Sequence, residues 1–183
     1  GGLVSNGTSC VGNVVRATGI ASVTDSGSTW NNRSLYVGWD ASGTLTVRAG
    51  GSVFASETGA LGYAERGKGV ATVSGAASTW KSQRDLQIGC YGSAVLNIRN
   101  GGNVTSGSNT TINGKSLLTI DICNGSSLAV GSGTGTFTNN GKIRLLAGAK
   151  PQALLNFSPI AAGAWGGTGT CQAIGGTWNA EIH

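Results

Sequence analysis

The sequence predicts an all-β fold, a parallel β-helix (β-solenoid) in which short strands wind into stacked turns. The stretch from Gly19 to Leu61 is repeated from Gly69 to Ile112, at an offset of 50 residues that becomes 51 after an insertion near Lys81. A period of this length is typical of repeat architectures. Apolar residues alternate with polar ones in short runs, which is the periodicity of strands. The 33 glycines suit tight corners, because glycine tolerates positive φ.

The first complete copy of the repeat occupies residues 19–68, and the second occupies residues 69–115. In the first copy, alternation marks strands at Ala21–Val23, Leu35–Val37 and Leu45–Val47, with the apolar side chains pointing into the core. Each copy holds about five such strands. Because a turn of a three-faced solenoid needs roughly 20–25 residues, each copy is expected to make about two turns.

The ends of the chain contain incomplete copies. Residues 1–18 match the end of a copy, and residues 116–145 keep the alternation with weaker similarity. We therefore expect solenoid repeats over residues 1–145. Residues 146–183 differ in composition and are expected to form an atypical C-terminal cap or a terminal strand segment, with one or two helical turns beginning at Pro151.

Tryptophan and glycine recur at fixed places in the two copies. Each Ser-Thr-Trp element ends in a tryptophan that is expected to pack over a corner of the solenoid. The alternative is that surface aromatics, including Tyr36, Trp39 and Tyr91, stack on sugar rings. Gly-Gly pairs are expected to form corners. The residues assigned a structural role are Trp30, Trp80, Gly50, Gly51, Gly101 and Gly102.

Basic residues also recur between the copies, and the pairs are Arg16 with Arg66, Arg33 with Arg84, and Arg48 with Arg99. Arg48 and Arg99 follow inward-pointing residues, so their side chains are expected to point outward. Columns of outward arginines would hold an acidic polysaccharide, because the guanidinium fork suits carboxylates. The alternative is that these residues are solubilising charges inherited with the repeat.

The four cysteines, Cys10, Cys90, Cys123 and Cys171, form no CxxC pair, and the one histidine is His183. No zinc or other metal site is therefore expected. An even number of cysteines allows disulfides, whose pairing the sequence leaves open. The alternative is that the cysteines are small buried hydrophobic residues.

Composition and residue placement argue against several functional classes. The net charge of +5 is modest and unclustered, so no nucleic-acid partner is expected, and no apolar stretch reaches the roughly 18–20 residues of a membrane span. The seven acidic residues form no recurring cluster, since Gly75 replaces Asp25 in the second copy, so neither catalysis nor a cofactor is expected. An ice-binding threonine ladder fails because Thr44 and Thr46 correspond to residues within Ala94–Asn97.

Four elements of the first copy carry a family resemblance: Val23-Thr-Asp-Ser-Gly-Ser-Thr-Trp30, Ser34-Leu-Tyr-Val-Gly38, Gly43-Thr-Leu-Thr-Val47 and Gly50-Gly-Ser-Val53. They resemble the bacterial repeat shared by autotransporter passenger domains and by surface proteins that bear a PEP-CTERM sorting signal. The resemblance covers residues 11–112 well and residues 113–145 loosely. It implies a right-handed parallel β-helix, secreted to the bacterial cell surface or extracellular matrix.

Two functions are expected from these features. The first is a non-enzymatic structural protein of the cell surface, biofilm or extracellular matrix, which associates with copies of itself head to tail into filaments. Cys10 and Cys171, near opposite ends, are candidates to lock that joint. The alternative is an adhesin or autotransporter passenger that binds acidic glycans through the arginine columns. A polysaccharide-active enzyme is a further, less favoured alternative.

Overall fold

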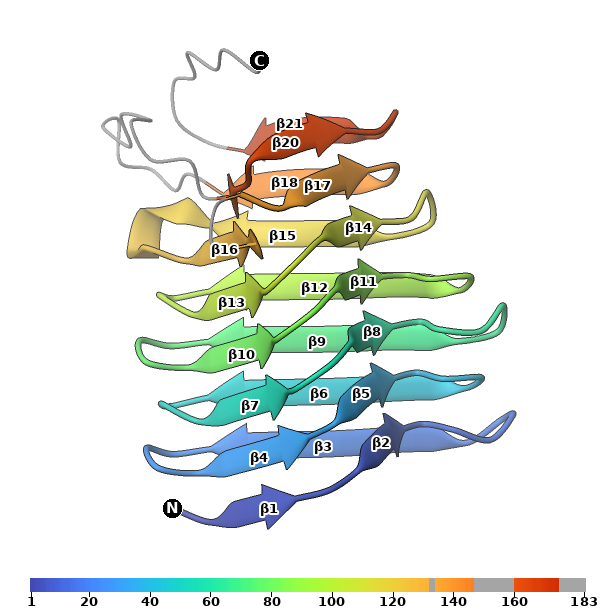
Figure 1. Cartoon of the computed structure of the whole chain (residues 1–183), viewed down its shortest axis with the longest axis vertical. Coiled ribbons are helices and arrows are strands. Elements are labelled where there is room, and N and C mark those ends of the chain that lie inside the picture. The colour runs from blue at the N-terminus through green and yellow to red at the C-terminus, as the bar shows by residue number, and fades with distance from the viewer. Residues whose placement is uncertain (132–133, 147–159, 175–183) are drawn as a thin grey trace.

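A computed structural model describes residues 1–131, 134–146 and 160–174, which form a β-solenoid of three parallel sheets with seven strands in each (Figure 1). Successive strands of the chain belong to sheets A, B and C in turn, and each set of three consecutive strands is one coil of the solenoid. The all-β parallel β-helix that the sequence predicts is thereby confirmed.

The strands are short, as the alternating pattern predicts. Sheet A contains β1 (Leu3–Ser5), β4 (Thr29–Asn32), β7 (Ser52–Ala55), β10 (Thr79–Ser82), β13 (Asn103–Ser106), β16 (Ser127–Val130) and β19 (Ile160–Ala161). Sheet B contains β2 (Thr8–Val11), β5 (Ser34–Val37), β8 (Gly59–Leu61), β11 (Leu86–Ile88), β14 (Thr110–Ile112), β17 (Thr136–Asn139) and β20 (Ala164–Gly166). Sheet C contains β3 (Thr18–Thr24), β6 (Ser42–Arg48), β9 (Lys68–Ser74), β12 (Ser93–Arg99), β15 (Leu117–Asp121), β18 (Lys142–Leu146) and β21 (Thr170–Ile174).

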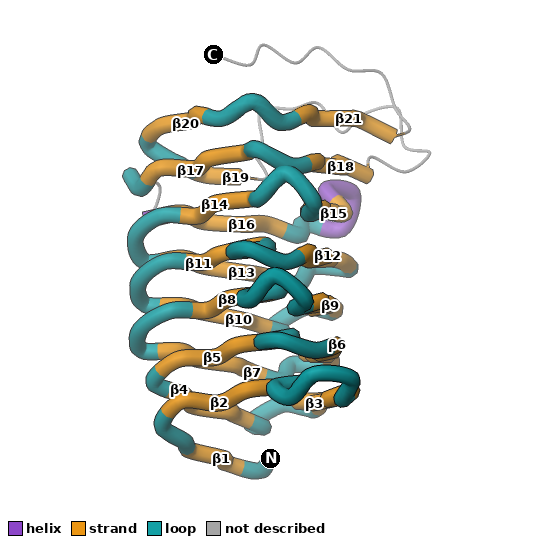
Figure 2. Tube along the Cα trace, turned by 90° about the vertical axis from the view of Figure 1, so that its right-hand side faces the viewer, coloured by secondary structure: helices purple, strands orange, loops and turns teal. Residues whose placement is uncertain are grey.

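The coil has a right-handed sense. In Figure 1 the chain rises from the N-terminus while it passes from left to right along the front through sheets A and B and returns along the back through sheet C. Right-handed connection is the strong preference for parallel strands joined by a crossover. Figure 2 shows the loops at the corners stacked in the same way as the strands.

One copy of the sequence repeat makes two coils. Trp30 and Trp80, which are 50 residues apart in the sequence, lie in the same column of sheet A with Val53 between them. A residue and its counterpart in the other copy are therefore two coils apart in the stack. The residue that lies between them, in the adjacent coil, belongs to the other half of the repeat.

The corners between sheets C and A alternate in length from one coil to the next, in step with the two-coil repeat. Residues 25–28 and 75–78 form the longer corners, and residues 49–51 form a shorter one, repeated at residues 100–102. In the shorter corners Gly50 and Gly101 have φ of 85° and 84°, a region that glycine enters without strain.

Serine joins the two kinds of corner. The backbone N–H of Gly50 donates to Oγ of Ser78 over 3.0 Å, and the Ser78 hydroxyl donates to the carbonyl of Ser74 over 2.8 Å. Ser126 accepts from the N–H of Gly101 in the same way, over 3.1 Å. Both serines are buried. A serine in the longer corner thus satisfies a backbone donor of the shorter corner next to it, a group that is costly to bury unpaired.

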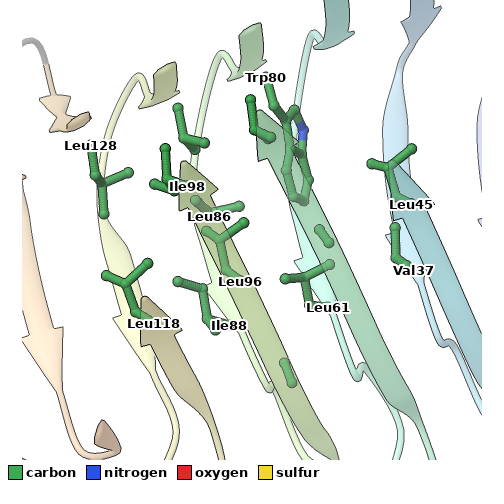
Figure 3. Close-up of a cluster of buried hydrophobic side chains, with 14 of the residues drawn as sticks. Val37, Leu45, Leu61, Trp80, Leu86, Ile88, Leu96, Ile98, Leu118 and Leu128 are labelled. Carbon is green, nitrogen blue, oxygen red and sulfur yellow. The ribbon is translucent and has the colours of Figure 1, made fainter. Parts of the chain in front are cut away.

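The core is a long column of inward side chains shared by the three sheets (Figure 3). Trp80 is only 1% exposed and lies among Leu61, Leu86 and Ile98, while Trp30 packs against the core and is partly buried. The interior position is possible because the inward position of β8 in sheet B is Gly59. A Cβ at Gly59 would lie 3.0 Å from the Trp80 ring and 2.3 Å from Oγ of Ser82.

The described part of residues 146–183 continues the solenoid. Strands β19, β20 and β21 add a seventh strand to each sheet, so residues 160–174 form another coil. The helical turn expected at Pro151 lies outside the described residues. The last residue of β18 is Leu146, one position beyond the boundary expected for the repeats.

Candidate functional site

Four aromatic side chains form a continuous cluster on the outer surface where sheet B turns toward sheet C. Tyr36 points outward from β5, and Trp39, Tyr63 and Tyr91 lie in the loops that follow β5, β8 and β11. Backbone hydrogen bonds fix their height, since the N–H of Tyr63 donates to the carbonyl of Gly38 and the N–H of Tyr91 donates to the carbonyl of Tyr63, each over 3.0 Å. We call these four residues the aromatic strip, which spans three successive coils.

The rings of the aromatic strip contact one another in sequence. Tyr36 meets Trp39 edge-on with centroids 4.5 Å apart, and it meets Tyr63 edge-on at 4.9 Å. Trp39 and Tyr63 are tilted by 34° at 4.4 Å, and Tyr63 meets Tyr91 edge-on at 6.3 Å. These separations are typical of attractive aromatic pairs. Tyr91 is 66% exposed and the other three are partly exposed, so the strip presents apolar surface to solvent.

The rings also shield the sheet beneath them. Ala60 occupies the outward position of β8 next to Tyr36 and is fully buried, although it does not belong to the inner core. Burial raises the pKa of the Tyr36 hydroxyl, and the neighbouring Tyr63 raises it further. The Tyr36 O–H therefore stays protonated at neutral pH and remains a hydrogen-bond donor.

An ion pair flanks the aromatic strip. Nε and Nη2 of Arg66 donate to the two carboxylate oxygens of Asp40, each over 3.3 Å, in a bidentate arrangement. Asp40 follows Trp39 directly, and Arg66 is three residues after Tyr63. Hydrogen bonding to Asp40, followed by the carboxylate's charge, raises the pKa of Arg66. The pair places donors and acceptors beside exposed ring surface.

A second set of the expected arginines is interrupted by an acid. Nε of Arg33 lies 3.1 Å from a carboxylate oxygen of Glu57, and the backbone N–H of Arg84 donates to the Glu57 carbonyl over 3.0 Å. The hydrogen bond from Arg33 lowers the pKa of Glu57. Glu57 thus lies between the two arginines, in the intervening coil. Aligning the two copies of the repeat pairs Arg33 with Arg84 and leaves this intervening coil out. This column alternates in charge and is not the purely cationic column that the sequence predicts.

Arg48 and Arg99 are the arginines that most resemble the expected column. Both are exposed, both lie at the C-terminal ends of sheet C strands, and Ser74 separates them by one coil on each side. Neither forms an ion pair within the part of the chain that the structure describes. They stand at the opposite end of sheet C from the aromatic strip, because strand β6 runs from Ser42 to Arg48. Arg16 is exposed in a corner loop with φ of 68°.

Three of the four cysteines are free. Cys10 and Cys171 are exposed and Cys90 is partly exposed, so no disulfide joins any two of these three, and the side chain of Cys123 is not described. The interpretation of these residues as small buried hydrophobes is wrong for Cys10 and Cys171. Cys10 points outward from β2, and Cys171 stands in an inward column but in the last described coil. Partial desolvation of the sulfur atoms by neighbouring groups raises the pKa of all three thiols.

Within the described ranges, no three His, Cys, Asp or Glu side chains gather where they could hold a metal ion. No helix there has the length and apolar character to cross a membrane.

Sequence reasoning missed Tyr63, which joins the aromatic strip into one surface. Its signal is a half-repeat: Val37-Gly-Trp39 corresponds to Leu61-Gly-Tyr63 in the next coil. A search at the period of one coil would have found it, whereas the period of one copy does not.

No protein-family model, curated protein or solved structure matches this chain. The resemblance to autotransporter passengers and PEP-CTERM surface proteins stays a prediction.

Proposed function

We propose that this chain is a non-enzymatic binding module of a secreted bacterial surface protein, and that it holds a glycan on the aromatic strip. The observation that carries the proposal is the arrangement of Tyr36, Trp39, Tyr63 and Tyr91, whose rings are in mutual contact, partly exposed and flanked by the Arg66–Asp40 ion pair. Such a surface offers both of the contacts that a sugar requires.

A sugar ring has an apolar C–H face and a rim of hydroxyl groups. The apolar face packs well on aromatic rings that carry a polar handle, as tyrosine and tryptophan do. The hydroxyl groups need donors and acceptors, which the Tyr36 hydroxyl, Asp40 and Arg66 supply. The coil register fixes Trp39 and Tyr63 through backbone hydrogen bonds, so little ordering is needed when a ligand binds.

Binding without catalysis fits the carboxylates beside the strip. Glycoside hydrolysis uses two carboxyl groups, one of them held protonated by burial. Asp40 is held by Arg66, and Glu65, the neighbouring carboxylate in the sequence, is exposed to solvent. Neither carboxyl group is enclosed in an apolar pocket, and both have oxygens that can accept hydrogen bonds from a bound sugar.

The test is a pull-down of the purified chain on insoluble polysaccharides, together with Tyr91→Ala and Phe54→Ala. Phe54 is the matched control because it is an outward-facing, partly exposed aromatic residue on sheet A, away from the strip. We expect binding that Tyr91→Ala weakens and Phe54→Ala leaves unchanged. Equal binding by all three proteins would contradict the assignment of the strip, and release of reducing sugars would contradict a non-enzymatic role.

A second candidate function is the head-to-tail building block. Each described coil stacks on the next through parallel strand pairs in all three sheets. A coil of a second copy would stack by the same main-chain pairing. Electron microscopy of the purified chain tests this function, with fibres of constant width as the supporting result and dispersed short rods as the contradicting one.

A further inference from the structure

The aromatic strip is elongated along the solenoid axis. Trp39 follows the sheet B strand of the second coil, Tyr63 that of the third and Tyr91 that of the fourth. Adjacent coils are spaced as neighbouring strands are, about 4.8 Å apart. The exposed apolar surface therefore runs across the strands, and a ligand that covers it must present several ring faces in a row.

In the three loops that carry the strip, and at the residue that follows each loop, acidic and basic residues are equal in number. Asp40 and Glu65 are acidic, and Arg66 and Lys68 are basic. Both guanidinium nitrogens of Arg66 that face Asp40 are already engaged by its carboxylate. An acidic sugar that pairs with these two nitrogens would have to displace Asp40 from Arg66, at the cost of leaving that carboxylate unpaired beside a second anion.

Arg48 and Arg99, which form no ion pair within the described residues, lie away from the strip. Arg48 and Arg99 stand at the far end of sheet C, so a chain lying along the strip does not reach them without crossing the full width of the sheet. A seven-residue strand such as β6 spans about 20 Å. The two arginines thus add nothing to the recognition of a ligand bound on the strip.

We propose that the aromatic strip binds an uncharged, extended polysaccharide of the β-1,4-linked glucan or xylan type, with its chain parallel to the solenoid axis. This inference rests on the proposed glycan-binding function and replaces the acidic glycan expected from the sequence. In β-1,4-linked glucose and xylose the ring substituents are equatorial, so both faces of each ring are lined by C–H groups. The C–H faces of successive rings then contact the exposed surface of Trp39, Tyr63 and Tyr91, while Asp40 and Arg66 hydrogen-bond the hydroxyls at the edge of the chain.

The experiment is isothermal titration of the full chain with cellohexaose, xylohexaose and hexagalacturonate, repeated with Tyr91→Ala and with the double variant Arg48→Ala/Arg99→Ala. We expect binding of a neutral hexasaccharide, a loss of affinity of about threefold to tenfold in Tyr91→Ala, and no change in the arginine variant. Affinity is also expected to rise with oligosaccharide length, and glucose alone should not compete. Because Tyr91 is largely exposed, its variant should unfold at the same denaturant concentration as the parent chain.

Other outcomes separate the two levels of the proposal. Binding of hexagalacturonate that is lost in the arginine variant would overturn the neutral-ligand inference and leave glycan binding intact at another surface. Binding of hexagalacturonate that is lost in Tyr91→Ala would keep the strip and overturn the neutral ligand. Neutral binding unaffected by Tyr91→Ala and by Tyr63→Ala would overturn the strip as the site. Failure of all three sugars to bind would overturn both the inference and the proposed function.

Discussion

Gly59→Ala is expected to destabilise the solenoid because Trp80 uses the space that Gly59 leaves. Gly59 is buried on β8, in an inward column between Leu35 and Leu86, and its φ is not in the positive region that only glycine favours. The backbone therefore accepts alanine. The added Cβ would lie 2.3 Å from Oγ of Ser82 and 3.0 Å from the Trp80 ring, so those side chains must move. Overpacking of this kind costs about 1–3 kcal/mol.

The destabilisation by Gly59→Ala should disappear in a variant whose residues 80 and 82 are replaced by the smaller residues that β7 has at the same column positions. Val53 and Ala55 of β7 pair with Trp80 and Ser82 of β10. The double substitution Trp80→Val and Ser82→Ala therefore gives β10 the same side chains that β7 has at the paired positions. This pair of substitutions alone should cost about 3 kcal/mol, near the lower end of the range for Trp→Ala because valine keeps part of the volume. In that background the Cβ of Gly59→Ala fills vacated space, so it should be neutral or stabilising.

The assay is equilibrium unfolding in urea, with the four proteins arranged as a double-mutant cycle. We expect a coupling free energy of about 1–3 kcal/mol between position 59 and the pair at positions 80 and 82. Gly7→Ala is the matched control, because a Cβ there meets nothing within 4 Å, and its effect should stay within about 0.5 kcal/mol. If Gly59→Ala costs the same in both backgrounds, the link between Gly59 and the buried tryptophan is refuted.

Three further predictions concern the corners, the ion pairs and the thiols. Ser78→Ala should cost about 1–3 kcal/mol in urea unfolding, because it leaves two partly buried backbone groups without their partner, whereas loss of less than about 0.5 kcal/mol would contradict the bridging role. The pKa of Glu57 is lowered in the folded chain by Arg33, so its contribution to stability is present above the ordinary pKa of 4.5 and is lost as the pH falls through the lower folded value. Urea unfolding from pH 7 to pH 3 should show a smaller loss of stability in Glu57→Gln, and an unchanged profile would exclude the contribution. A maleimide should label Cys10 faster than Cys90 without denaturant, since Cys10 is exposed and Cys90 is partly buried, and equal rates detected by mass spectrometry would contradict the described surface.

The structural corrections share one physical origin, which is the identity of the adjacent coil. The two copies of the sequence align Arg33 with Arg84, but the coil between them places Glu57 against both. The same effect hides the aromatic strip, since Trp39 and Tyr63 belong to different halves of one copy. Comparison at the copy period finds residues two coils apart, which do not touch directly.

The sequence by itself determined the strand type, the approximate number of turns per copy and the inward columns. These features are local, because alternation of side chains along a strand decides which ones face the core. Only the tertiary structure decided which residues meet across coils. That register depends on how each corner loop returns the chain to its column, since corners of different length keep Trp30, Val53 and Trp80 aligned. The buried Trp80 is an example. Its ring fits in the core because the facing residue on the neighbouring sheet is Gly59, which lies more than twenty positions earlier in the chain, so the local sequence around Trp80 does not reveal it.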